Sequence, residues 1–277
     1  MNHHTILTEG INNINVEGLL AGNQHFESDE IQKVQTSLDA WKSQVLGDFK
    51  LSEGREMDET IDQLNLQLNI ITKGVHSLGE ENKKTDRVMR NLYAHLLQTK
   101  TQWLKNLVDL DDADPAVVRE YGVEVFDQNE TKGYDFIKEA EKKGDAQSKY
   151  HLAHILKDDP NKAGLALQLM LEAADANIPE AWDFLGEFYN LGAVREIKVE
   201  RNPAFSGVYY FKAVALGNLE SLRMIEHFRK SGNTDVVEAF DAEMKQNPGS
   251  QEKYDALVKQ NAAMTKSSTD LVEKFSL

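Results

Sequence analysis

The sequence contains no cysteine, which excludes disulfide bonds, thiolate nucleophiles and cysteine-ligated zinc. Proline is scarce as well, with 5 residues in a chain of 277. No segment approaches the roughly 18 consecutive apolar residues that a membrane-spanning helix requires. Residues 1–22 lack a basic segment followed by an apolar run, so no signal peptide is predicted and the expected location is cytoplasmic. Together these absences favour an ordered, helical protein.

Basic residues are in the minority: 31 Lys and Arg stand against 46 Asp and Glu, a formal net charge of −15. Such a charge repels phosphates and anionic membrane surfaces, so neither nucleic acid nor a membrane is an expected ligand. A basic protein or peptide is the partner that the charge favours. The alternative interpretation, which the sequence leaves open, is that the acidity only keeps the protein soluble.

The first part of the chain predicts a flexible arm followed by a coiled-coil hairpin. Residues 1–27 are polar and have no sustained period, which is typical of a loosely held segment. Apolar residues then alternate three and four apart over 31–49 and again over 57–78, so each segment has one narrow apolar stripe. With a turn over 50–56, the two stripes can bury each other as an antiparallel hairpin.

The heptad pattern continues through 82–110, where the apolar stripe widens with residues such as Tyr93. A wide stripe is typical of a helix that faces a globular core, so this helix is expected to dock onto the domain that follows. Residues 28–110 therefore form the predicted hairpin and docking helix. Asp114 before Pro115 has the cap-then-proline order that begins a new helix.

From residue 115 the chain repeats itself. Ala140, Ala173 and Ala213 superpose at spacings of 33 and 40 residues. Small and large residues recur around this anchor in all three segments. The aligned positions are Gly133, Ala166 and Ser206 upstream, and Ser148, Ala181, Ser221, Leu152, Leu185 and Ile225 downstream. Repeats of this length are typical of stacked helix pairs, in which small residues allow neighbouring helices to approach closely.

Two segments carry a resemblance to a known family. Ala181-Trp-Asp-Phe-Leu-Gly-Glu-Phe-Tyr-Asn-Leu-Gly192 and Phe205-Ser-Gly-Val-Tyr-Tyr-Phe-Lys-Ala213 resemble the Sel-one-like repeats, relatives of the tetratricopeptide repeat. The resemblance covers 115–232 and implies an α/α superhelical solenoid that serves as an adaptor or scaffold in protein complexes. Residues 233–277 are then expected to form C-terminal capping helices.

The sequence departs from the repeat pattern in two places. The copy at 148–160 ends in Asp-Pro, where the others end in Gly192 and Gly232, and the longer spacing places seven extra residues within 193–202. This charged segment is either an exposed contact loop or a tolerated insertion.

No motif indicates catalysis: Gly-x-Ser-x-Gly, the P-loop, Gly-x-Gly-x-x-Gly and His-Glu-x-x-His are all missing. His151 and His154 lie three residues apart, but no third ligand is near in sequence, so neither a metal nor another cofactor is predicted. We therefore expect a binding protein and not an enzyme. An enzyme whose site is assembled from residues far apart in the sequence stays an alternative.

The expected function is that of a protein–protein adaptor or scaffold, which binds through the concave repeat surface, the hairpin or both. The residues predicted to face the partner are Tyr150, His154, Asp183, Glu187, Arg223 and His227. In an alternative, the chain's own capping helix fills this surface and the hairpin binds instead. A dedicated inhibitor or immunity-type protein that blocks one basic target is the other functional candidate. We expect a monomer or weak homodimer, because the hairpin arms satisfy each other.

Overall fold

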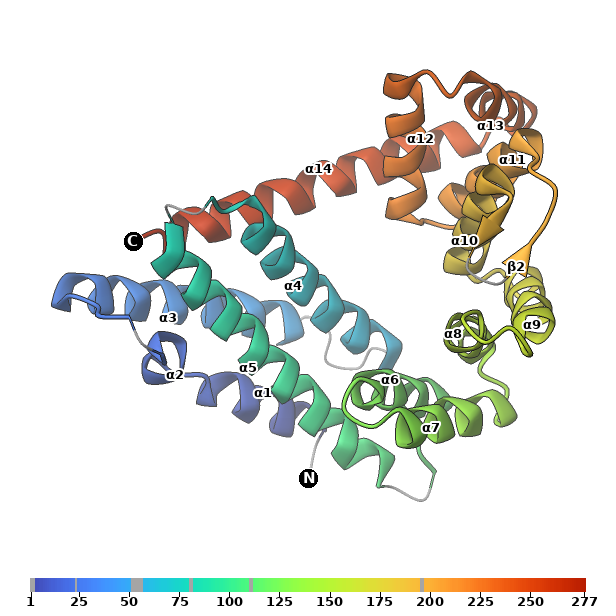
Figure 1. Cartoon of the computed structure of the whole chain (residues 1–277). Helices are drawn as coiled ribbons and strands as arrows, with labels where there is room; N and C mark the ends of the chain where they lie inside the picture. The colour runs from blue at the N-terminus through green and yellow to red at the C-terminus, as the bar shows by residue number, and fades with distance from the viewer. Residues whose placement is uncertain (1–2, 23, 51–56, 80–81, 110–111, 195–196) are drawn as a thin grey trace. The chain divides into compact units, whose positions relative to one another are not determined.

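The computed structural model describes residues 3–22, 24–50, 57–79, 82–109, 112–194 and 197–277. Most of the predicted turn at 50–56 and part of the charged 193–202 segment lie outside these residues. The described chain is almost entirely α-helical, so the all-α prediction is confirmed (Figure 1). It divides into two compact units, residues 1–124 with 263–277, and residues 125–262. None of the described helices has the length and apolar character needed to cross a membrane.

Unit 1 is built from six N-terminal helices and the second half of the last one. Their bounds are α1 (His3–Asn13), α2 (Val16–Leu20), α3 (Ser28–Lys50), α4 (Met57–Ser77), α5 (Lys83–Val108), α6 (Pro115–Phe126) and α14 (Ser250–Phe275). Helix α5 packs against α4 on one side and against α1 and α2 on another. Its wide apolar stripe therefore faces α1, α2 and α4.

The prediction of a loosely held arm is wrong for residues 3–20. Helices α1 and α2 form there, and they bury Leu7, Ile11, Ile14 and Leu19 at 3% exposure or less. The only local sign of this is the four- and three-residue spacing of Leu7, Ile11 and Ile14, which is too short a pattern to outweigh the surrounding Asn and Gly.

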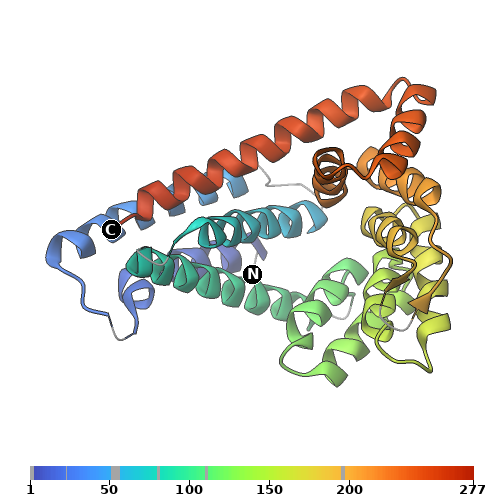
Figure 2. The ribbon, with the colours of Figure 1, turned by 45° about the horizontal axis from the view of Figure 1, so that its top comes forward.

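The closest helix partner of α4 is α5, whereas the sequence predicted α3. Both helices form, but the helix that packs closely on α4 is α5, across the short link after Ser77. The narrow stripe of α3 instead meets α1, α2 and the end of α14, where the Ser37 hydroxyl donates to the Lys274 carbonyl at 2.5 Å (Figure 2). The second half of the last helix thus belongs to unit 1. The sequence had predicted that all of residues 233–277 form capping helices at the end of the repeats.

A buried lysine connects helices α4, α5 and α6 of unit 1 through ion pairs and a hydrogen bond. Lys100 of α5 is 1% exposed, and its Nζ lies 2.6 Å from Glu120 Oε1 and 2.5 Å from Glu124 Oε1 on α6. Nζ also donates to Asn65 Oδ1 of α4 at 2.7 Å. Burial alone would raise the pKa of Glu120, but the charge and hydrogen bond of Lys100, helped by Asn65 and Arg119, hold it below the usual value.

Unit 2 is a succession of short helices joined by tight turns. Their bounds are α7 (Glu130–Lys142), α8 (Ala146–Leu156), α9 (Ala163–Asp175), α10 (Pro179–Leu191), α11 (Pro203–Ala215), α12 (Leu219–Ser231), α13 (Thr234–Gln246) and the first half of α14. Successive helices from α7 to α13 contact one another, and α11 packs closely on α13, two helices further on, as well as on α10; Figure 1 shows the helices following one another in chain order. The residues between α10 and α11 include a small antiparallel ribbon of β1 (Ala193–Val194) and β2 (Ile197–Lys198).

The three aligned segments have the same backbone at their turns. Gly144, Asn177 and Gly217 all adopt positive φ, at 98°, 63° and 97°. The next helix starts directly after each turn, and Asp145 and Asn218 cap α8 and α12 by accepting from the amides three residues on. A left-handed residue at this point reverses the chain tightly, so the helices before and after it form a pair.

The small residues of the alignment are buried where helices meet. Ala140, Ala173 and Ala213, and likewise Ser148, Ala181 and Ser221, are 0% exposed. The closest approach involves Gly207 of α11, where an added Cβ would lie 2.3 Å from the Val236 carbonyl oxygen of α13. The absence of a side chain at Gly207 therefore sets how tightly α11 and α13 pack.

Replacing Lys100 with methionine should destabilise unit 1 by about 3–5 kcal/mol, because Glu120 and Glu124 would remain buried without their cation. The measurement is the free energy of unfolding from urea denaturation followed by circular dichroism. Lys105→Met on the same helix removes an exposed lysine and should change stability by less than about 0.5 kcal/mol. Equal effects of the two substitutions would show that the buried ion pairs contribute nothing special.

Gly207→Ala should cost about 1–3 kcal/mol, because the new methyl group collides with backbone of α13 that cannot move independently. Gly164→Ala is the matched control, since its added Cβ meets no atom within 4 Å. The control should leave the melting temperature unchanged or raise it slightly, because alanine has the higher helix propensity. Comparable losses in both variants would contradict the close contact described here.

Candidate protein-binding surface

Four carboxylates of unit 2 form a patch that we call the acidic strip: Glu180, Asp183 and Glu187 of α10, and Glu220 of α12. Glu187 and Glu220 are exposed, whereas Asp183 is half-buried. Among the described residues, no Lys or Arg forms an ion pair with Glu180, Asp183 or Glu187. The strip therefore carries negative charge that the protein itself balances only at Glu220, through Arg223.

Asp183 lies at the centre of the strip. Its carboxylate accepts a hydrogen bond from the hydroxyl of Ser221, which joins α10 to α12. Burial, together with the charges of Glu187, Glu220 and Glu180, raises the pKa of Asp183 to about 6, although the bond from Ser221 opposes this. The raised pKa reflects a carboxylate that has lost water without gaining a cation.

Tyr150 of α8 borders the same carboxylates. Burial raises its pKa to about 12, with further contributions from Glu180, Asp183 and Glu187. Tyr210 of α11 is 1% exposed, and burial with the charges of Asp183 and Glu187 raises its pKa too. Both phenols therefore stay protonated, and at the strip Tyr150 can act as a neutral hydrogen-bond donor beside the negative charge.

Arg223 of α12 is engaged within the chain. Its Nη1 lies 2.8 Å from Glu220 Oε2, and its Nε and Nη2 donate to Asn261 Oδ1 of α14 at 3.2 and 3.0 Å. The first half of α14 also buries Leu257 against the core of α11, α12 and α13. The last helix thus packs beside Arg223, next to the exposed Glu220 of the strip.

The two predicted histidines stand at the margin. His154 is exposed, its ring centroid is 6.0 Å from that of Tyr150, and its Nδ1 lies 3.1 Å from Lys157 Nζ. His227 is also exposed, and its ring lies 6.1 Å from that of Phe228. Of the six predicted residues, the structure therefore brings Tyr150, Asp183 and Glu187 together and links Arg223 to them through Glu220. His154 lies beside Tyr150, and His227 makes no described contact with the strip.

A second surface was not predicted from the sequence. Trp182 and Tyr189 of α10 form a continuous aromatic cluster with Phe205 and Tyr209 of α11, with ring centroids 5.4 to 6.2 Å apart. Lys212 Nζ lies 3.9 Å above the ring of Trp182. Phe205 is 50% exposed, and Leu191, two residues after Tyr189, is 59% exposed. The four- and seven-residue spacing of these aromatics was the available signal, but it equally fits a helix–helix core.

The described residues contain no group of three or more His, Asp or Glu side chains arranged to hold a metal ion. The acidic strip offers carboxylates and phenols, and Ser221, whose hydroxyl donates to one of these carboxylates, is 0% exposed and so is not open to a substrate. Its chemistry suits charge pairing and hydrogen bonding with a cationic group.

No protein-family model and no curated protein matches the chain. The resemblance to Sel-one-like repeats therefore stays a prediction that depends on the residues quoted for it.

Asp183→Asn should stabilise the protein at neutral pH and leave it unchanged or weaker near pH 4. Folded Asp183 holds its proton more tightly than the unfolded chain does, so its contribution to stability falls as pH rises from about 4 to about 6. Asparagine can still accept from Ser221 but carries no charge. We expect a gain of about 1–3 kcal/mol at pH 7.5, measured by urea unfolding across the pH range. A constant difference between variant and parent at every pH would contradict the raised pKa.

Proposed function

We propose that the protein is a non-catalytic adaptor or scaffold whose helical repeats form an α/α solenoid and hold a basic protein or peptide on the acidic strip. The observation that carries the proposal is the uncompensated charge of Glu180, Asp183 and Glu187 around Tyr150. A solvent-facing group of carboxylates without cations costs stability, and a partner's Lys or Arg side chains would supply the missing charge.

The repeat architecture is supported by local geometry. The turns at Gly144, Asn177 and Gly217 share one backbone conformation, and the aligned alanines and serines are buried at the helix contacts. Helices that contact others one or two places away in the sequence, as α11 contacts α10 and α13, are typical of solenoids, which present extended surfaces for binding other proteins.

The aromatic cluster favours an adaptor over a dedicated inhibitor. Helical spacing places Trp182 and Tyr189 on a different face of α10 from Asp183 and Glu187. Trp182 and Tyr189 are half-buried and Phe205 is exposed, and partly accessible aromatic residues are typical interface anchors. Unit 2 thus has two chemically different surfaces, one acidic and one aromatic, as a protein that holds two partners would need. The inhibitor alternative uses the acidic strip alone.

The test measures binding of a Lys- and Arg-rich peptide to the full chain by isothermal titration calorimetry. Changing Glu180, Glu187 and Glu220 to Gln should weaken binding about tenfold or more, because charge pairs at the strip are lost. A control with Glu200, Glu238 and Glu252 changed to Gln removes three exposed carboxylates elsewhere in unit 2. It makes the net negative charge smaller by the same amount as the strip variant does. The control should bind within about twofold of the parent, since distant charges are screened at about 0.1 M salt.

Two outcomes count against the proposal. Equal weakening by the strip variant and the control would mean that only net charge attracts the peptide. Binding that persists as salt is raised from about 0.1 M to about 1 M, where screening becomes strong, would mean that charge pairing is not involved. A one-to-one complex of nanomolar strength with a single natural basic protein, unaffected by Phe205→Ala, would favour the inhibitor.

A further inference from the structure

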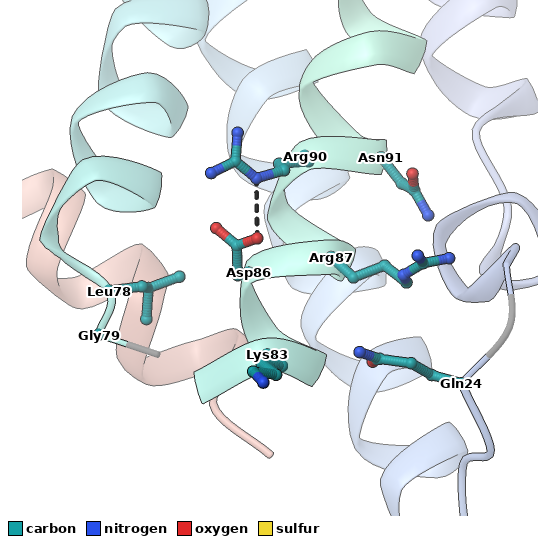
Figure 3. Close-up of a pocket in the computed structure, with 8 residues that line it drawn as sticks. All are labelled: Gln24, Leu78, Gly79, Lys83, Asp86, Arg87, Arg90 and Asn91. Atoms are coloured by element: carbon teal, nitrogen blue, oxygen red, sulfur yellow. Dashed lines mark hydrogen bonds and ion pairs between the residues drawn. The ribbon is translucent and has the colours of Figure 1, made fainter. Parts of the chain in front are cut away.

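A cluster of positive charge lies in unit 1, at a pocket of about 590 Å³ between the end of α4, the first turns of α5 and Gln24 (Figure 3). Lys83, Arg87 and Arg90 of α5 line it together with Asp86 and Asn91. The three cations are spaced four and three residues apart, which places them on one face of the helix. This arrangement is unexpected in a chain with a net charge of −15.

The hydrogen bonds within the pocket leave positive charge available for a ligand. Asp86 is the one carboxylate among the lining side chains, and it accepts from Arg90 Nε at 2.8 Å. The two terminal nitrogens of Arg90 are outside this bond, and among the described residues no carboxylate pairs with Lys83. The start of α5 adds the partial positive charge of a helix N-terminus.

Other contacts hold the pocket wall in shape. Arg87 Nη1 donates to the Ala21 carbonyl at 3.1 Å, and Asn91 Nδ2 donates to the carbonyls of Leu19 and Ala21 at 2.8 and 3.2 Å. These bonds fix the segment after α2 against α5, so the wall formed by Gln24 is tied to the helix that carries the cations. Arg87 therefore both lines the pocket and stabilises it.

Gln24 adds a requirement of a different kind. Its side-chain Oε1 is buried and has no hydrogen-bond partner among the described residues. A buried acceptor without a donor is unfavourable because it has lost its hydrogen bonds to water, so a ligand that brings a donor would be favoured here. The pocket is thus complementary to a molecule that presents several acceptor oxygens to Lys83 and Arg90 and one O–H to Gln24.

We propose that this pocket binds a phosphate group that carries a hydroxyl, as inorganic phosphate does at neutral pH and as a phosphate monoester does when singly protonated. The oxygens would face Lys83, Arg87 and Arg90, and the P–OH would donate to Gln24 Oε1. Sulfate has the same shape but no O–H at this pH, so it lacks the donor. The volume leaves room for the body of a small phosphate ester. This inference concerns unit 1 and does not rest on the function proposed for unit 2.

The experiment titrates the full chain with inorganic phosphate, glucose 6-phosphate and sulfate at constant ionic strength, by calorimetry and by the shift in melting temperature. Phosphate should bind at one site about tenfold or more tightly than sulfate, because only phosphate satisfies Gln24. Tighter binding of glucose 6-phosphate than of inorganic phosphate would identify an ester as the ligand. The reverse order would identify free phosphate.

Two variants test the residues. Lys83→Ala with Arg90→Ala should reduce phosphate affinity at least about tenfold, since two charge-assisted contacts are lost. Lys33→Ala with Lys105→Ala removes two exposed lysines outside the pocket and should leave affinity within about twofold. Gln24→Leu should lower phosphate affinity to the level of sulfate while sulfate binding stays unchanged. Circular dichroism verifies that each variant is folded.

The inference is overturned if phosphate and sulfate bind equally to the parent protein, which would indicate an adventitious anion only. It is also overturned if the control pair of lysine substitutions weakens binding as much as the pocket pair does, because net charge would then explain the effect. Preserved discrimination against sulfate in Gln24→Leu would remove the role assigned to Gln24.

Discussion

Two helices can approach closely only where one of them lacks a bulky side chain, and unit 2 depends on this constraint. Gly207 lets α11 reach the backbone of α13, and Gly186 of α10 lies against the ring of Tyr210, where an added Cβ would be 3.0 Å away. Alanine or serine occupies other fully buried positions of unit 2, such as Ala140, Ala173, Ser148 and Ser221. Large residues such as Leu185 and Ile225 fill the space between these close contacts, so the alternation of small and large side chains fixes helix spacing.

The helical content and the repeat register could be predicted, because both depend on short-range patterns. The turns at Gly144, Asn177 and Gly217 follow directly from aligned segments of the sequence. The partners of the N-terminal helices could not be predicted in the same way. The apolar stripe of α4 indicates that another apolar surface packs on it. It does not indicate whether that surface belongs to α3 or α5, since both helices have matching stripes. The helices of residues 3–20 form because α5 offers a surface to them, which their own sequence does not reveal.

The candidate surface shows the same division. Helical spacing predicted that Tyr150 of α8 and Asp183 and Glu187 of α10 face a common surface, and in the structure the charges of both carboxylates act on Tyr150. It gave no sign that Asn261, 38 residues beyond Arg223, would take up that guanidinium. The aromatic cluster was missed because Trp182 and Tyr209 have spacings that fit a buried core as well as an exposed face. Burial is a property of the whole packed chain, and local sequence carries little of it.

The ribbon of β1 and β2 lengthens the connection between α10 and α11 without changing the burial of the aligned alanines in the stacked helices. The spacing from Ala173 to Ala213 exceeds that from Ala140 to Ala173 by seven residues, yet all three alanines are fully buried. Hydrogen bonds from Val199 to Gly192 and from Asn202 to Tyr189 close the base of the added segment beside α10. Ile197 of β2 is 5% exposed, so the ribbon also packs on the core, and a foreign epitope or reporter tag grafted into this connection has to keep that contact.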